Sequence, residues 1–312
     1  MPATINHDDV ISPSLLTLKE ISLDDRELFS RYLQLAPHEL AVYAFENIYM
    51  WKDLYRVTWD IIDDHLCIFF TDAQGTFLYL PPLAAEVRPD VVDAVFEFLD
   101  AVNTNKSVLR IEYVEEADVE WYRALGYDCS VISHDYLYAT DQLVRLQGNS
   151  YKAKRACVNY FSKNYAFEVC DYADDFRDEC LALYQHWAAQ RRANCDDPVY
   201  CGMMEDSFVT LQTVLEAYSQ MECRGKVVRV DGEVKAFTIG YQLSPEAMCV
   251  LFEITDLSVK GLAQFIFRQF CEELSAYPRI NAMDTLGMEN LDTVKLSYRP
   301  VRLAPAYAVR RV

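Results

Sequence analysis

The sequence has few basic residues and no long apolar run. Its 29 lysines and arginines are outnumbered by 48 aspartates and glutamates, so the formal net charge is −19. A net negative charge disfavours binding to DNA or to an anionic membrane through the electrostatic field of the whole protein. Any polyanion would have to bind a local basic patch. The apolar stretches at 66–70 and 91–99 are far shorter than the roughly 20 residues of a membrane-spanning helix. We therefore expect no integral membrane segment.

Signals for export, metal binding and triad chemistry are also missing. Residues 1–11 carry Asp8 and Asp9 where a secretory signal would have basic residues and an apolar core. The ten cysteines stand singly, without a C-x-x-C pair, which is typical of reduced thiols in a cytoplasmic protein. The five histidines follow no metal-ligand spacing, and the chain has no G-x-S-x-G or Walker loop. We expect a cytoplasmic protein without a metal site.

A chain of 312 residues is long enough for two modules. Residues 1–13 are predicted to be disordered or extended. The first module, 14–140, is predicted to hold three antiparallel strands between residues 56 and 80. Pro89 then begins a helix whose apolar stripe contains Val91, Val95, Phe98 and Leu99.

The second module, 141–312, is predicted to begin with helices at 150–164, 174–192 and 203–219. Strands at 226–230, 233–241 and 247–255 follow, with Asp231-Gly232 as a two-residue hairpin turn. A helix, a strand, a helix and a last strand then complete this module, at 261–275, 279–283, 289–298 and 301–309. Residues 109–127 and 279–300 look alike, which indicates a duplicated domain.

These patterns resemble a known family. The segment 122–127, Tyr-Arg-Ala-Leu-Gly-Tyr, and the order of elements are similar to the Gcn5-related N-acetyltransferase fold. Residues 136–309 resemble the C-terminal domain family of phosphatidylglycerol lysyltransferase, through the segments 135–138, 147–161, 229–240, 284–287 and 295–300. The resemblance implies an α/β (α+β) protein of two tandem acetyltransferase-like modules, each a mixed, mostly antiparallel sheet flanked by helices. It also implies transfer of an acyl group to an amine or hydroxyl.

Two segments depart from the family patterns. The acetyltransferase phosphate loop reads Arg/Gln-x-x-Gly-x-Gly/Ala, and this chain keeps only its latter part. The predicted cofactor-binding residues are Ser258, Lys260, Gly261, Leu262 and Ala263, because a strand-to-helix turn can hold phosphate on backbone N–H groups. The same turn can also be an ordinary connection in which glycine permits the backbone angles. Where the lysyltransferase group has Glu-Lys-Ala-Asp, residues 253–256 read Glu-Ile-Thr-Asp.

Four residues are candidates for catalysis. Glu253 lies at the end of a central strand, where a partly buried carboxylate can act as a general base, with Asp256 as its neighbour. Tyr298 is a candidate acid for the leaving group, and Asp284 is expected near the same last helix. The alternatives are a structural carboxylate paired with a cation for Glu253 and a packed aromatic ring for Tyr298.

The candidate substrate-binding residues include the one basic island of an acidic chain. Lys152, Lys154 and Arg155 fall on a predicted helix and could meet phosphates of coenzyme A or of a tRNA acceptor stem. Lys295 and Trp187 are further candidates for the acceptor site. A solvated helix face is the structural alternative for the basic residues, and core packing is the alternative for Trp187.

The sequence therefore predicts an acyltransferase with no tightly bound cofactor. Its co-substrate would be an acyl-coenzyme A or an aminoacyl-tRNA, and its acceptor a small molecule or a lipid head group. A non-catalytic binding scaffold that uses the cleft between the two modules is the alternative, since fold alone does not decide function.

Overall fold

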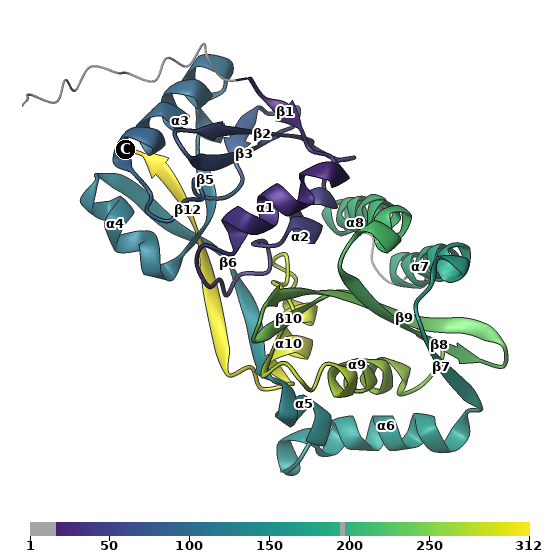
Figure 1. Cartoon of the computed structure of the whole chain (residues 1–312). Helices are drawn as coiled ribbons and strands as arrows, with labels where there is room; N and C mark the ends of the chain where they lie inside the picture. The colour runs from purple at the N-terminus through teal and green to yellow at the C-terminus, as the bar shows by residue number, and fades with distance from the viewer. Residues whose placement is uncertain (1–16, 194–196) are drawn as a thin grey trace, which may run out of the picture. The chain divides into compact units, whose positions relative to one another are not determined.

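The computed structural model describes residues 17–193 and 197–312, which form two compact units (Figure 1). Unit 1 contains the described residues up to Ala36, Tyr55–Ser130 and Tyr307–Val312, and unit 2 contains Pro37–Leu54 and Val131–Ala306. The predicted boundary between residues 140 and 141 was based on an apparent duplication of the domain. The two units do not test that duplication, so the boundary stays a prediction. The segment 1–13 lies outside the described residues. Among the described residues, no helix combines the length and apolar composition that a membrane crossing requires.

Unit 1 is built on a small, mostly antiparallel sheet. Its strands are β1 (Lys19–Glu20), β2 (Arg56–Ile62), β3 (His65–Thr71), β4 (Thr76–Leu78) and β5 (Ile111–Glu115), hydrogen-bonded in that order. The helices of this unit are α1 (Arg26–Leu33), α3 (Pro89–Val102) and α4 (Val119–Ala124). The predicted apolar stripe of α3 is confirmed, because Val91, Val95 and Leu99 are fully buried against Phe69 and neighbouring core residues.

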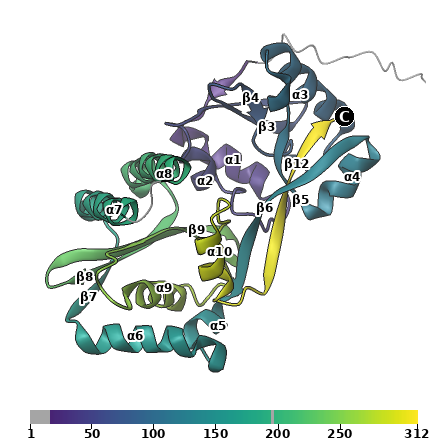
Figure 2. The same cartoon turned by 180° about the vertical axis from the view of Figure 1, so that it is seen from behind.

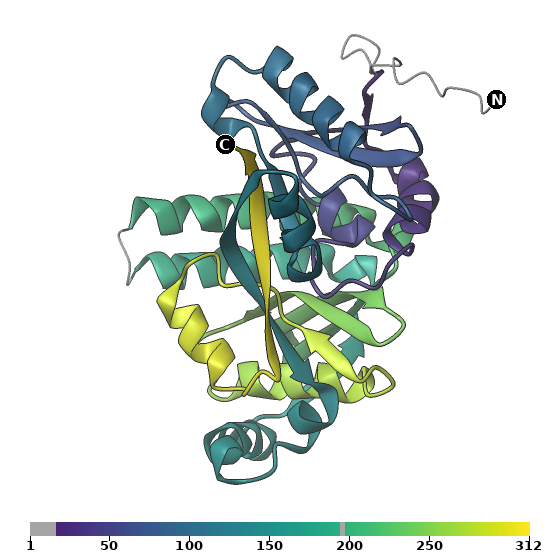
Figure 3. The same cartoon turned by 90° about the vertical axis from the view of Figure 1, so that its left-hand side faces the viewer.

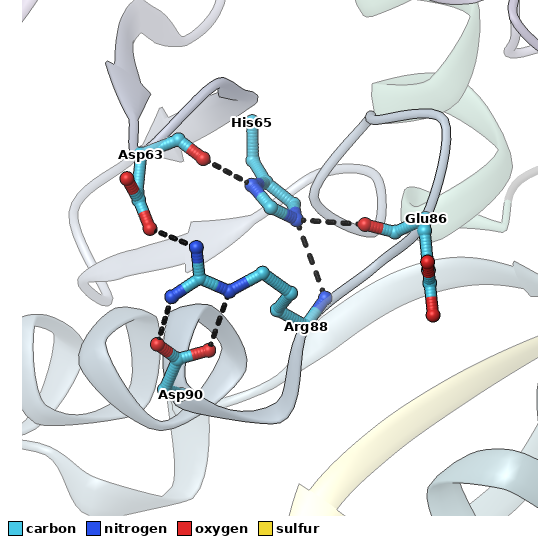
Figure 4. A network of polar contacts seen from close by, with 5 residues as sticks. All are labelled: Asp63, His65, Glu86, Arg88 and Asp90. Carbon is cyan, nitrogen blue, oxygen red and sulfur yellow. Dashed lines mark hydrogen bonds and ion pairs between the residues drawn. The ribbon is translucent and has the colours of Figure 1, made fainter. Parts of the chain in front are cut away.

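A polar network fixes the β2–β3 turn to the start of α3 (Figure 4). The buried ring of His65 lies 2.7 Å from the Asp63 carbonyl through Nδ1, and 3.2 Å from the Arg88 amide nitrogen through Nε2. With a proton on Nδ1, the ring donates to that carbonyl and accepts from the Arg88 N–H. The Arg88 guanidinium in turn pairs with Asp63 and Asp90. Asp63, His65, Arg88 and Asp90 thus tie the β2–β3 turn to the start of α3, and the Glu86 carbonyl lies 3.2 Å from His65 Nε2.

The sheet of unit 2 carries the candidate site. Its strands follow the order β6 (Tyr127–Ala139), β11 (Arg279–Asn281), β10 (Ala247–Thr255), β9 (Glu233–Ser244), β8 (Cys223–Val230) and β7 (Phe167–Asp171). On its other side β6 has β12 (Arg302–Arg311) as neighbour, and both strands have residues in each unit. In this sheet β10 and β11 pair parallel, whereas β6 with β11, β10 with β9, β9 with β8 and β8 with β7 pair antiparallel.

Helices cover both faces of this sheet (Figures 1 and 2). They are α6 (Lys152–Asn164) and α9 (Leu262–Glu273) on one face, and α7 (Arg177–Arg192) and α8 (Pro198–Ala217) on the other. The core divides accordingly, since Met248 packs with the α9 side and Phe252 with the α7 and α8 side. Unit 2 also contains the short helices α2 (Phe45–Tyr49), α5 (Thr140–Arg145) and α10 (Glu289–Leu296).

The predicted fold class is confirmed, a mixed α/β structure with a mostly antiparallel sheet flanked by helices. The hairpin at Asp231-Gly232 is also confirmed, because both residues have positive φ as a two-residue turn requires. Helix α8 begins at Pro198, earlier than the predicted residue 203, since Asp197 caps the Val199 N–H at 2.9 Å. Strand β7 and helix α5 were not predicted from the sequence.

Candidate active site

The site lies where the parallel strands β10 and β11 stop pairing. Among the described residues, the two strands pair only from Ala247 to Cys249 of β10, whereas the pairing of β10 with β9 continues to Thr255. Beyond Cys249, β10 stays paired with β9 along one edge and no longer pairs with β11 along the other. Lys154 of α6 and Lys295 of α10 lie near the second half of β10, close enough to act on the Glu253 charge.

A bulge in β10 sets the direction of Glu253. Val250 is opposite Gly240, yet Phe252 is opposite Ile239, so one extra residue is inserted in β10. The alternation of faces is thereby shifted, and Glu253 falls on the same face as Met248 and Val250, toward α9. Gly240 permits this geometry, because a Cβ there would lie 2.2 Å from the Cys249 carbonyl oxygen. A strictly alternating strand would have placed Glu253 on the opposite face.

Glu253 is a desolvated carboxyl between two lysines. Burial raises its pKa to about 8, and the positive charges of Lys154 and Lys295 oppose that rise. Near neutral pH both its acid and base forms are accessible, which general acid–base catalysis requires. Among the described residues, no lysine or arginine nitrogen lies within 4.0 Å of the Glu253 carboxylate, so the predicted alternative, a carboxylate paired with a cation, is not seen as a direct ion pair.

Lys154 and Tyr298 form one wall beside Glu253. The Nζ atom of Lys154 lies 3.9 Å from the centre of the Tyr298 ring, a cation–π contact. Burial lowers the pKa of Lys154, and the nearby Cys157 and Glu253 charges raise it. The Tyr298 side chain is buried against Phe267, and burial raises its pKa well above the ordinary value. Tyr298 therefore stays protonated, which an acid for the leaving group requires.

Lys295 and Asp284 form a second charged pair, and Lys295 is near Glu253. The Lys295 ammonium donates to the carbonyls of Ala282 at 2.7 Å, Met283 at 3.2 Å and Asp284. Burial lowers the Lys295 pKa and raises the Asp284 pKa, and the charge of each opposes the effect on the other. Lys295 thus fixes the chain between β11 and α10 and adds positive charge near Glu253.

One buried carboxyl of this region was missed by the sequence analysis. Asp135 on β6 accepts the Ala41 N–H at 2.7 Å and the Asn281 side-chain amide at 2.8 Å. Burial raises its pKa to about 6, although both hydrogen bonds act in the opposite direction. The residue stands in the segment that carried the family resemblance, but its partners come from distant parts of the chain and left no local signal.

Asp256 shapes the turn that follows β10. Its carboxylate accepts from the Ser258 amide at 3.0 Å and the Ser258 hydroxyl at 2.6 Å, and pairs with Lys235 at 3.2 Å. Burial alone would raise its pKa, but these donors outweigh burial and lower it to about 2. A carboxylate so strongly held as an anion is a poor base near neutral pH. The catalytic assignment of Asp256 stays a prediction, and its contacts explain it as a turn residue.

The predicted phosphate turn precedes α9. Gly261 caps this helix with a φ of +85°, and a Cβ on it would lie 2.3 Å from the Cys157 carbonyl oxygen of α6. Close packing of α6 therefore accounts for the glycine. Lys260 is exposed and lies over the Tyr160 ring at 4.6 Å, and the Leu262 N–H donates to the Val259 carbonyl at 3.3 Å. Phosphate binding by Ser258, Lys260, Gly261, Leu262 and Ala263 remains a prediction.

The other candidate residues are more scattered. Lys152 is exposed on α6, and Arg155 donates to the Gly148 carbonyl at 2.7 Å and to the Leu146 carbonyl. Trp187 lies on α7, on the other face of the sheet, and packs on Tyr184 with a ring separation of 5.3 Å. The structure therefore brings Glu253, Tyr298, Lys154, Lys295 and Asp284 into one region. Trp187 is partly buried against the core beside α7 and α8, and its role in acceptor binding stays a prediction.

The candidate site is therefore a desolvated carboxyl on a mostly antiparallel sheet, at the point where two parallel strands diverge. The family model for phosphatidylglycerol lysyltransferase, C-terminal, matches residues 34–310. The chain belongs to this family, and is thereby related to aminoacyltransferases.

Solved structures agree on the fold. A conserved protein of unknown function from Bacteroides thetaiotaomicron has a TM-score of 0.85 at 23% identity, with coverage of 95% of this chain and 99% of that one. L-PGS from Bacillus licheniformis gives 0.61 at 17% identity, with coverage of 92% of each chain. FemX gives 0.60 at 9% identity, with coverage of 94% and 97%. At these identities the likeness establishes the fold alone.

Proposed function

We propose that the protein is an acyltransferase that moves an aminoacyl or acyl group to an amine or hydroxyl acceptor, with Glu253 as the general base. The family membership supports the reaction class. The observation that carries the proposal is the position of Glu253 on the bulged half of β10, with a pKa raised to about 8 and two lysines nearby. A carboxyl of this pKa can take a proton from an acceptor near neutral pH, whereas an ordinary exposed glutamate is a much weaker base.

In the proposed step, the Glu253 carboxylate removes a proton from the acceptor as its nitrogen or oxygen attacks the donor carbonyl carbon. The bond from that carbon to the donor oxygen or sulfur then breaks, and the leaving group takes up a proton. The positive charges of Lys154 and Lys295 would stabilise negative charge that develops on the carbonyl oxygen. Tyr298, which burial keeps protonated, is the candidate donor to the leaving group.

The donor is an aminoacyl-tRNA or an acyl-coenzyme A, and the acceptor a lipid head group or a small molecule. The exposed Lys152 and Lys260 are basic residues in a chain of net charge −19 and would offer local contacts for phosphates of either donor. Both donors are cytoplasmic, which fits the location that the sequence predicts. We favour the aminoacyl donor because the family is named for lysyl transfer.

The test is a transfer assay with both donor types and a matched pair of variants. Radiolabelled aminoacyl-tRNA and acetyl-coenzyme A are each incubated with phospholipid vesicles and with a panel of small amines. Glu253→Gln removes the base and keeps the side-chain size, and Glu272→Gln changes an exposed glutamate of α9. We expect label transfer by the wild type and by E272Q, and a loss of roughly 100-fold or more in E253Q.

The outcomes separate the proposal from a binding scaffold. Transfer at equal rates by E253Q and E272Q would exclude Glu253 as the base. Binding of a donor without any transfer, across both donors and all acceptors, would favour the scaffold.

A further inference from the structure

A cavity of about 280 Å³ lies in unit 2 at the opposite end of β10 from Glu253. It is lined by the segment Pro37–Glu39 and by residues of β6, the β9–β10 hairpin and β11. Ala247, the first residue of β10, lies on its wall, six positions before Glu253. At about 3.3 Å per residue, the cavity and Glu253 are roughly 20 Å apart along the strand. The cavity is therefore separate from the proposed catalytic region.

Arg279 supplies positive charge to this cavity. Half of its side chain is exposed, and its guanidinium lies 3.6 Å from the Glu39 carboxylate. That distance is longer than a hydrogen bond, so the paired N–H donors of Arg279 can still bind a ligand carboxylate in the bidentate manner typical of arginine. The other oxygen of Glu39 is held by Arg302 at 2.6 Å, which fixes that carboxylate at the cavity wall.

Negative charge and apolar surface lie beside Arg279. Glu39 and Glu246 both line the cavity, together with the apolar Pro37, Leu137, Leu243 and Ala247. Arg302 balances the charge of Glu39, so Glu246 is the carboxylate that would repel an anion unless the anion also carried a positive group. A compact ligand with a carboxylate, an ammonium and a small apolar part matches all three features.

The walls are held rigidly. The Asn281 side-chain amide donates to the Glu39 carbonyl at 2.7 Å and to the buried Asp135 at 2.8 Å. The His38 ring stacks on Tyr43 with a centroid separation of 3.9 Å. A cavity whose polar groups are already positioned loses less entropy when it binds a ligand.

We infer that this cavity binds a free α-amino acid, with its carboxylate on Arg279 and its ammonium on Glu246. The size agrees with a small ligand, because the volume lies just below the roughly 300 Å³ at which pockets for drug-sized ligands begin. Nothing in the inference depends on the proposed transfer reaction. The site would let the protein respond to the concentration of an amino acid at a place remote from Glu253.

Isothermal titration calorimetry on the whole chain tests the inference with the twenty free amino acids as probes. For any amino acid that binds, the N-acetyl derivative lacks the ammonium and the corresponding amine lacks the carboxylate. We expect both derivatives to bind at least tenfold more weakly than the parent. If none of the twenty binds, or if either derivative binds as tightly as the parent, the inference is wrong.

Binding measurements on three variants test whether the ligand lies in this cavity. Arg279→Gln should weaken binding by roughly 10- to 100-fold, because it removes a charge-assisted pair of hydrogen bonds. Arg224→Gln, at another exposed arginine that does not line the cavity, should leave the Kd unchanged. E253Q should also bind normally. Normal binding by R279Q, or loss of binding in E253Q, would put the ligand elsewhere, and neither result depends on whether transfer is observed.

Discussion

Among single residues, Glu253 is the most important, because its surroundings set its pKa. Burial disfavours the carboxylate, and the charges of Lys154 and Lys295 favour it, so the pKa settles near 8 instead of higher. Lys154 is held in place by its contact with the Tyr298 ring. The charge of Lys154 therefore helps to set the pKa of the proposed base.

We predict that Lys154→Met raises the Glu253 pKa above its wild-type value, because it removes a nearby positive charge and leaves burial unopposed. Lys152→Met on the same helix is the matched control, since Lys152 is exposed and does not contribute to the Glu253 pKa. The measurement is a ¹³C NMR titration of protein labelled at the glutamate carboxyl carbons, with E253Q to assign the signal. A wild-type midpoint near 4.5, or equal midpoints in the two lysine variants, would contradict the prediction.

Most residues of the site could be predicted from the sequence, but the contacts that each residue makes could not. Glu253, Tyr298, Asp284 and Lys295 were all identified as candidates, and they lie in one region. The sequence could not separate Lys154 from Lys152 and Arg155, because only packing decides which basic residue of α6 turns inward. Asp135 was missed for the same reason, since its partners Ala41 and Asn281 are 94 and 146 positions away.

At the scale of elements, packing of α6 on α9 builds one side of the site (Figure 3). Helix α9 covers the sheet, α6 lies outside it, and the backbones approach closely at Gly261. The positive φ of Gly261 could be predicted from a glycine between a strand and a helix. Its contact with Cys157 could not, because it depends on a helix about 100 positions earlier. The bulge in β10 likewise interrupts a pattern that the sequence presents as regular.

We predict that Gly261→Ala destabilises the protein more than Gly232→Ala does. The two glycines have nearly equal positive φ, +85° and +84°, so the backbone penalty of about 1 kcal/mol is shared. A Cβ at 261 also meets the Cys157 carbonyl, whereas a Cβ at 232 meets nothing within 4 Å. Overpacking of this kind costs about 1–3 kcal/mol more.

Urea unfolding of both variants gives the comparison. Similar losses of unfolding free energy in G261A and G232A would show that α6 does not press on this turn, and would remove the structural explanation of Gly261.

At the scale of the whole molecule, titration of buried carboxyls sets how stability depends on pH. Glu253 and Asp135 have folded-state pKa values of about 8 and about 6, both above the unfolded values. Such groups bind protons more tightly in the folded state, so their effect on stability becomes unfavourable as pH rises from about 4 to about 8. Asp256 has the opposite sign, because its pKa of about 2 gives stability that is lost as pH falls below about 4.

We therefore expect a higher unfolding free energy at about pH 5.5 than at about pH 8. The net charge of −19 acts in the same direction, since protonation of carboxyls relieves repulsion. Urea midpoints measured across this range test the prediction, and E253Q should show a weaker fall toward pH 8 than the wild type. Stability that rises from pH 5.5 to pH 8 would contradict it.

The pH dependence of kcat/KM for label transfer tests the central claim most directly. For the wild type we predict a rate that increases about tenfold per pH unit below an apparent pKa near 8 and then levels off, as the Glu253 carboxylate forms. E253Q should be at least about 100-fold slower and should lack this rise. The same rise in E253Q as in the wild type would mean that another group is the base, and the account of the site would be wrong.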